Sequence, residues 1–345
     1  MHIVVEFTNI EMHKLHRGRR SVVAALGAGL IAAASGPFAQ DRTKVWRIGV
    51  LSGRQRPSAI DATPLSGFIT GLRELGYIEG KNVIVEWRFL EGRYELIPEL
   101  TNELVRSRVD ILVVTTPAAI RPIQALKLSL PIVMGTSVDP VRNGFVASLA
   151  RPGGNTTGLA SLTEEVTSKH VQLMADVLPK LNRLGILMNP GNPNGNTVLN
   201  AAQLVAKKFG ASVISENAKT PQELGPAFAN LQDARVDAVV IALDAFFNSN
   251  LSQIGELALK SRLPSIYGIR EYADAGGLLS YGANLKDQYR RAASYVDKIF
   301  KGANPGNIPV EQPTAFELII NMKAAKALLL DVPKSLLISA DMIIE

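Results

Sequence analysis

Polar side chains with hydrogen-bonding groups recur directly after short apolar segments of this sequence. They comprise hydroxyls, amides, two carboxylates, a guanidinium and two phenols, and this mixture suits reversible binding of a polar small molecule. Since ligands of open α/β sheets bind beyond the carboxyl ends of the strands, these positions are the candidate ligand-binding residues. Together with Pro117 and Ala118, whose backbone belongs to the same kind of segment, the set is Ser52, Arg54, Gln55, Thr115, Thr116, Ser137, Asp139, Asn189, Asn192, Asp244, Tyr267 and Tyr281.

Thr115–Ala118 is the most informative of these segments. It has two hydroxyls and the free N–H groups of a helix start, and both suit a carboxylate or another anion. The alternative is structural, with Thr116 as the N-cap of the next helix and Pro117 in its first position. The sequence is compatible with both interpretations.

The other candidates have equally plain structural alternatives. Asp244 follows a second apolar strand and is expected either to pair with a ligand ammonium or to cap the helix that starts at Ala245. Asp139, before Pro140, is a turn residue or a ligand contact. Tyr267 stacks on a ligand ring or closes a core edge. Asn189 and Asn192 lie in a loop rich in Asn, Pro and Gly, and His170 is expected at a surface or between two lobes.

Motifs of enzymes and metal sites are missing from the sequence. It contains no G-x-G-x-x-G after the first strand, no phosphate-binding loop with Gly-Lys-Ser/Thr, no G-x-S-x-G and no H-E-x-x-H. It has no cysteine and four histidines, three of which are His2, His13 and His16. We therefore predict no catalytic residue, no metal site and no cofactor.

Size and composition describe a globular chain with room for two domains. The chain has 345 residues, 47% of them hydrophobic and 20% charged, with a formal net charge of +6. No cluster of Lys and Arg follows residue 39, so a nucleic-acid partner is not expected.

The first 39 residues have the pattern of a secretory signal peptide. Arg17–Arg20 is followed by an uncharged run, Ser21–Ser35, and by Gly36–Gln40. Cleavage is expected after Ala39, with Ala34 as the alternative, and Met12 is the expected start of the leader. The sequence thus predicts export to the periplasm.

Two halves of the sequence repeat one pattern of segments. Arg47–Leu51, Val109–Val114 and Leu130–Gly135 are echoed in the same order by Arg183–Leu187, Val236–Ile241 and Leu263–Gly268. Expected strands alternate with amphipathic helices, which predicts parallel sheets covered on both faces. The expected strands are 47–52, 83–89, 111–115, 132–135, 184–188, 212–215, 238–243, 265–267, 277–281 and 308–310. The expected helices are 65–75, 97–107, one opening at 116–119, 164–178, 197–209, 222–232, 251–261, 288–300 and 315–330.

Several motifs together resemble one protein family. Leu149–Gly158, Thr116–Ala119, Asp139–Val141, Asn321–Ala327 and Val332–Asp341 are similar to the ABC-transporter substrate-binding proteins that include tryptophan-binding members. The resemblance implies a type I periplasmic-binding-protein fold, with two Rossmann-like lobes joined by three crossovers. The implied lobes are 45–157 plus 283–306 and 158–282 plus 307–345. The implied crossovers lie near 156–161, 281–284 and 305–309.

The resemblance also implies a function. A monomeric periplasmic receptor would capture a small organic solute, an amino acid or small carboxylate, and present it to an inner-membrane ABC permease. Arg54, Gln55 and Arg56 replace smaller residues of the tryptophan-binding pattern, which leaves room for another acid or amide. The alternatives are a two-lobed enzyme such as a glycosyltransferase and the effector-sensing domain of a regulator, which would need a helix-turn-helix ahead of the first lobe.

Overall fold

A computed structural model describes residues 44–192 and 194–345, so the expected signal peptide lies outside the described residues. The first sheet is entirely parallel and has the strand order β2-β1-β3-β4-β5. Its strands are β1 (Trp46–Ser52), β2 (Val83–Phe89), β3 (Ile111–Val114), β4 (Ile132–Met134) and β5 (Thr156–Gly158).

Side chains of β1 pack on both faces of the first sheet. Ile48 packs with residues of α1 and α10, whereas Leu51 packs with residues of α2 and α3. We call this sheet with its helices the first lobe. Its helices are α1 (Ser66–Glu74), α2 (Ile97–Arg106), α3 (Ile120–Ala125) and α10 (Leu285–Phe300), with short 3₁₀ turns at Ile60–Ala62, Tyr94–Leu96, Pro117–Ala119 and Pro305–Asn307.

The second sheet has the order β12-β11-β10-β9-β8-β6-β7, and β10 and β11 form its antiparallel pair. Its strands are β6 (Arg183–Met188), β7 (Ser212–Asn217), β8 (Ala238–Ile241), β9 (Ser265–Tyr267), β10 (Leu279–Ala283), β11 (Phe316–Asn321) and β12 (Met342–Ile344). The helices of this second lobe are α4 (Thr163–Val177), α5 (Gly195–Ala206, extended by a 3₁₀ turn at Lys207–Phe209), α6 (Pro221–Asp233), α7 (Ala245–Asn248), α8 (Leu251–Lys260), α9 (Arg270–Asp274), α11 (Met322–Ala327) and α12 (Lys334–Ser339).

The sequence repeat corresponds to a structural repeat. The order β2-β1-β3-β4-β5 of the first sheet matches the order β7-β6-β8-β9-β10 within the second. The three pairs of similar segments contain β1 and β6, β3 and β8, and β4 and β9. Ile186 of β6 packs with α4 and α5, and Leu187 packs with α6 and α8, so the second sheet is also covered on both faces.

Three crossings connect the lobes. The chain leaves β5 for α4 through residues 159–162, and it returns from β10 to α10 at Asn284. It crosses again through residues 312–315, before β11. The expected third crossing at 305–309 is wrong, because Ile308 and Val310 are buried in the two cores of the first lobe.

Two other expectations for the tail are wrong. Residues 308–310 form no strand; the neighbouring Glu311 forms an isolated bridge with Leu159. The helix expected over 315–330 is β11 followed by α11, because Phe316–Asn321 pairs with β10 and the Asn321 side chain then caps α11 at Ala324. The sequence pattern does not predict β5, since its Thr-Thr-Gly sequence is too short and polar to stand out.

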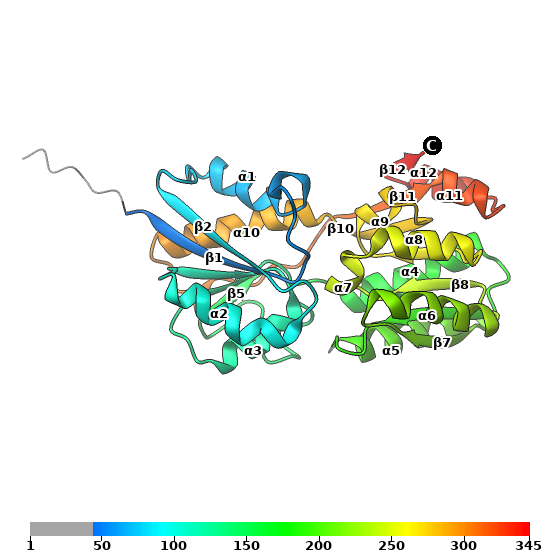
Figure 1. Ribbon diagram of the computed structural model, residues 1–345, viewed down its shortest axis with the longest axis horizontal. Coiled ribbons are helices and arrows are strands. Elements are labelled where there is room, and N and C mark those ends of the chain that lie inside the picture. The colour runs from blue at the N-terminus through cyan, green and yellow to red at the C-terminus, as the bar shows by residue number, and fades with distance from the viewer. Residues whose placement is uncertain (1–43, 193) are drawn as a thin grey trace, which may run out of the picture. The chain divides into compact units, whose positions relative to one another are not determined.

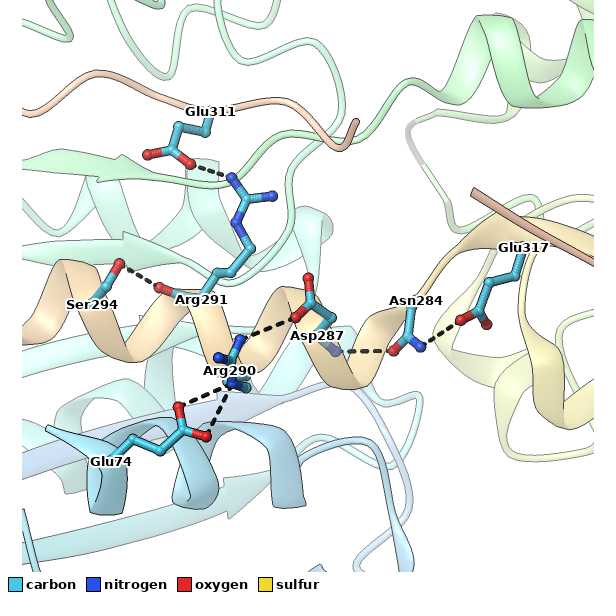
Figure 2. Close-up of polar contacts among 8 residues, drawn as sticks. All are labelled: Glu74, Asn284, Asp287, Arg290, Arg291, Ser294, Glu311 and Glu317. Carbon is cyan, nitrogen blue, oxygen red and sulfur yellow. Dashed lines mark hydrogen bonds and ion pairs between the residues drawn. The ribbon is translucent and has the colours of Figure 1, made fainter. Parts of the chain in front are cut away.

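Polar contacts connect α10 to the second and third crossings and to α1 (Figure 2). The Asn284 side chain accepts a hydrogen bond from the Asp287 amide and donates one to Glu317 of β11, at 2.9 and 2.7 Å. Arg291 pairs with Glu311, just before the third crossing. Arg290 pairs with Glu74 of α1 at 3.0 Å. The second and third crossings are therefore tied to one helix.

Glycines let α1 and α10 approach closely; the two helices lie side by side (Figure 1). A Cβ built on Gly67 would lie 1.9 Å from the backbone oxygen of Lys286, and one on Gly71 would lie 2.4 Å from that of Arg290. Any side chain at either position would force the helices apart.

Gly67→Ala is expected to lower the free energy of unfolding by about 3 kcal/mol, because the backbone of α10 has to move. Gly225→Ala in α6 is the control, since its Cβ would have no neighbour within 4 Å. That change is expected to be neutral or to stabilise by up to about 1 kcal/mol. Urea unfolding followed by circular dichroism measures both, and equal midpoints for the two variants would contradict the packing.

Candidate functional site

A cavity lies where strand ends of the two lobes face each other. Its volume is about 110 Å³, whereas one water molecule needs about 10–15 Å³, so it has room for a small organic molecule. Residues from both lobes and from all three crossing regions line it, among them Thr116, Leu162, Asp244, Leu285 and Pro313.

Half of the candidate residues line this cavity. They come from the ends of β1, β3, β6 and β8, as the strand-end rule predicts: Arg54, Thr115, Thr116, Pro117, Ala118, Asn192 and Asp244. Arg54 and Asp244 are the charged residues among the described lining residues. The cavity therefore offers one cation and one anion in an otherwise neutral wall.

The remaining candidates do not line the cavity: Ser52, Gln55, Ser137, Asp139, Asn189, Tyr267 and Tyr281. Ser52 and Ser137 are fully buried beside it, and the exposed Gln55 donates its backbone N–H to Ser249 at 3.3 Å. Asp139 is a turn residue with φ of 35°, and its carboxylate accepts from the Arg142 amide. Local turn chemistry thus explains Asp139.

Asp244 is held by a complete set of donors although only 4% of it is exposed. Its Oδ1 accepts from Asn189 and from the Phe246 amide, at 2.9 and 2.8 Å. Its Oδ2 accepts from Asn192 at 2.9 Å and from the Tyr94 hydroxyl at 3.1 Å. Burial raises the pKa of the Asp244 carboxyl, and the hydrogen bonds oppose this shift. Capping of α7 is thus one of its roles.

The hydroxyl of Thr116 is not used as a helix cap. Thr116 occupies the N-cap position with Pro117 next to it, yet its side chain makes no capping hydrogen bond. It lines the cavity and is 5% exposed. The capping alternative for Thr116 is therefore wrong, and its hydroxyl is available to a bound molecule.

Arg54 reaches across to the second lobe. Its Nη2 lies 3.6 Å from Oε1 of Glu271 in α9, an ion pair too long for a hydrogen bond. Arg54, Thr115 and Tyr289 line the same cavity. Burial raises the pKa of the Tyr289 hydroxyl, whereas the charge of Arg54 lowers it.

Two tyrosines expected at the site have structural roles instead. Tyr267 is fully buried, and its hydroxyl donates to Asn248 Oδ1 at 2.5 Å. Tyr281 stacks on Phe316 with ring centroids 5.7 Å apart. Its backbone oxygen accepts from Nε2 of His170 at 2.7 Å. His170 is 3% exposed, so it is a core residue rather than a surface one.

Sequence reasoning missed several lining residues. Tyr94 follows β2, so extending the strand-end rule to that strand would have found it. Gln288 and Tyr289 come from α10, and Phe316 opens β11. Their positions depend on the second and third crossings, which no local sequence pattern predicts.

Within residues 44–192 and 194–345, no group of three His, Cys, Asp or Glu side chains is arranged to hold a metal ion. Over the same ranges, no helix is long and apolar enough to cross a membrane.

Two parallel-sheet lobes, three crossings and a cavity between strand ends define a two-lobed binding protein of the type I periplasmic fold. The model of the family described as "ABC transporter substrate binding protein" matches residues 50–344. The chain therefore belongs to this family of transporter substrate-binding components, a family of binding proteins and not of enzymes.

Similar proteins support this assignment. A tyrosine-binding protein of Clostridioides difficile is 26% identical over 289 residues, which cover 84% of this chain and 82% of that protein. A conserved domain protein from Vibrio cholerae has a TM-score of 0.80 and 26% identity, over 87% of this chain and all of that one. A domain from Streptococcus pneumonia in complex with L-Trp has a TM-score of 0.79 and 25% identity, over 87% of this chain and 99% of that one.

His170 predicts a pH dependence of folding. Burial lowers its pKa from 6.5 to about 4, so its contribution to stability is complete above pH 6.5 and is lost as pH falls toward 4. The loss is expected to reach about 3 kcal/mol. His170→Gln keeps a donor for the Tyr281 oxygen. This change should remove the loss of unfolding free energy that His170 causes between pH 6.5 and 4. Urea unfolding of wild type and His170→Gln between pH 7 and 4 measures this effect. If the free energy of unfolding falls equally with pH in both proteins, His170 is not the cause.

Proposed function

We propose that this protein is a periplasmic receptor that captures a small organic solute, an amino acid or small carboxylate, and presents it to an inner-membrane ABC permease. The pairing of Asp244 with the polar segment Thr115–Ala118 around one cavity carries this proposal. An ammonium and a carboxylate on one molecule complement these two groups.

The carboxylate of the solute would contact the Thr116 hydroxyl and the amides that follow it. Its ammonium would approach Oδ2 of Asp244. Because Asp244 already accepts four hydrogen bonds, about as many as a carboxylate can take, the ammonium has to share Oδ2 or take the place of the Tyr94 hydroxyl. Tyr94 belongs to the first lobe, so this exchange would link binding to the contact between the lobes.

Relatives narrow the solute class. One is named for tyrosine and another was solved with L-Trp, and both share about a quarter of their residues with this chain. We therefore propose that the solute is an amino acid. Because Arg54 lines the cavity, the side chain of that amino acid need not be aromatic.

Closure of two lobes around the solute is the proposed mechanism. The solute favours the closed form only by its extra affinity for that form. We propose lobe boundaries that follow the packing, so that residues up to Glu311 join the first lobe and β11 begins the return to the second. A signal peptide cleaved after Ala39 and a monomeric state complete the proposal.

In a thermal-shift screen of the twenty amino acids and of small carboxylates, at least one amino acid is expected to stabilise the mature chain. The bound amino acid is expected to be released unchanged. Calorimetry on the best hit should then show binding at micromolar or lower concentration. A screen in which no compound stabilises the protein would contradict the proposal.

Asp244→Asn provides the residue-level test. The ammonium interaction predicts that this change weakens the best amino acid by about tenfold or more and spares its analogue lacking the amino group. Asp139→Asn, at an exposed turn outside the cavity, is the matched control and should leave both affinities unchanged. Equal weakening of both compounds by Asp244→Asn would show that the residue only shapes the cavity.

A further inference from the structure

Two side-chain atoms without a hydrogen-bond partner lie beside each other, one on Arg54, which lines the cavity, and one on Glu271, which does not. Among the described residues, three buried side-chain atoms lack a hydrogen-bond partner, and two of them are Nη2 of Arg54 and Oε1 of Glu271. They face each other at 3.6 Å, close enough for attraction between charges and too far for a hydrogen bond. Leaving a buried charged donor unsatisfied is unfavourable, so such a group calls for a partner.

The rest of Arg54 is held in place. Its side chain is 16% exposed, and it forms an ion pair with Glu271 of the second lobe. Because a guanidinium has five N–H donors in a rigid planar fork, the ion pair at Nη2 also orients the other N–H groups. This residue is the only cation among the described lining residues.

Arg54 and the polar segment Thr115–Ala118 are neighbours. A Cβ on Gly53, the residue before Arg54, would lie 3.0 Å from the Thr116 hydroxyl. Arg54, Thr115 and Tyr289 all line the cavity. We therefore expect a single anionic group in the cavity to contact the Thr116 hydroxyl and the guanidinium together.

We propose that Arg54 is the cationic residue that binds the carboxylate of the solute, which rests on the proposed function and specifies how it recognises an acid. The guanidinium donates to a carboxylate oxygen, while the ion pair of its Nη2 with Glu271 keeps it at the lobe boundary. The protein then selects an acid over the matching amide, whatever side chain the solute has.

The test compares amino acids with their α-carboxamides. L-tyrosine and L-tyrosinamide, L-tryptophan and L-tryptophanamide, and L-leucine and L-leucinamide are titrated calorimetrically into the mature wild-type protein. For each pair that binds, the ratio of acid affinity to amide affinity is expected to fall by about tenfold or more in Arg54→Gln. Arg54→Lys, which keeps a cation, is expected to recover part of the ratio.

Arg56→Gln is the matched control. Arg56 is exposed, lies over the Phe89 ring and does not line the cavity, so the ratio should stay within about threefold of wild type. Thermal unfolding of each variant checks that it is folded. If a folded Arg54→Lys variant binds neither acid nor amide, Arg54 shapes the cavity and the proposal is overturned.

The outcomes separate this inference from the function on which it rests. Acids that bind with the same ratio in wild type and Arg54→Gln overturn the inference and leave the receptor function standing. If none of the three acids binds, the inference fails, and the screen of all amino acids and carboxylates decides the function.

Discussion

The close approach of α10 to α1 is the contact on which this architecture depends. After the chain has built β6 to β10 of the second sheet, α10 returns to the first lobe and packs where Gly67 and Gly71 leave room for its backbone. The ion pair between Arg290 and Glu74 lies along the same contact. Without this return the lobes would be joined by one crossing, and Gln288, Tyr289 and Phe316 would not reach the cavity.

Three crossings restrict how two lobes can move. Asn284 connects the start of α10 to Glu317 of β11, and Glu311 forms a bridge with Leu159 of the first crossing. Neighbouring crossings of this kind allow bending about a short set of residues and resist twisting or separation. The same geometry places Tyr94 of one lobe on Asp244 of the other, so the contact between the lobes and the polar groups of the cavity form one network.

The cavity combines low polarity with two fixed charges. Asp244 is oriented by donors from Asn189, Asn192 and Tyr94, and Arg54 is oriented by its ion pair with Glu271. In such a setting a charged ligand group gains more from a correctly placed partner than it would in water. Pre-organised groups also lose little entropy when the solute arrives.

The strand and helix pattern of both halves, and the cavity residues at strand ends, could be predicted because buried parallel strands give continuous apolar runs. Thr116, Arg54 and Asp244 were found in this way. Tyr267 and Asn189 also follow strands, yet they point into the fold, because the direction of a side chain depends on packing that the sequence pattern does not encode. The tail could not be predicted, because Phe316–Asn321 has helix-compatible spacing and becomes a strand only by pairing with β10.

The most direct test of the central claim, a solute held by closure of two lobes, is a distance measurement between them. The chain has no natural cysteine, so Asn102→Cys and Lys208→Cys, both exposed, can carry one spin label on each lobe. Electron–electron double resonance on the labelled mature protein should show a distance distribution that narrows and shifts when the best-binding amino acid is added at saturation. An unchanged distribution with calorimetrically bound solute would contradict closure as the mechanism.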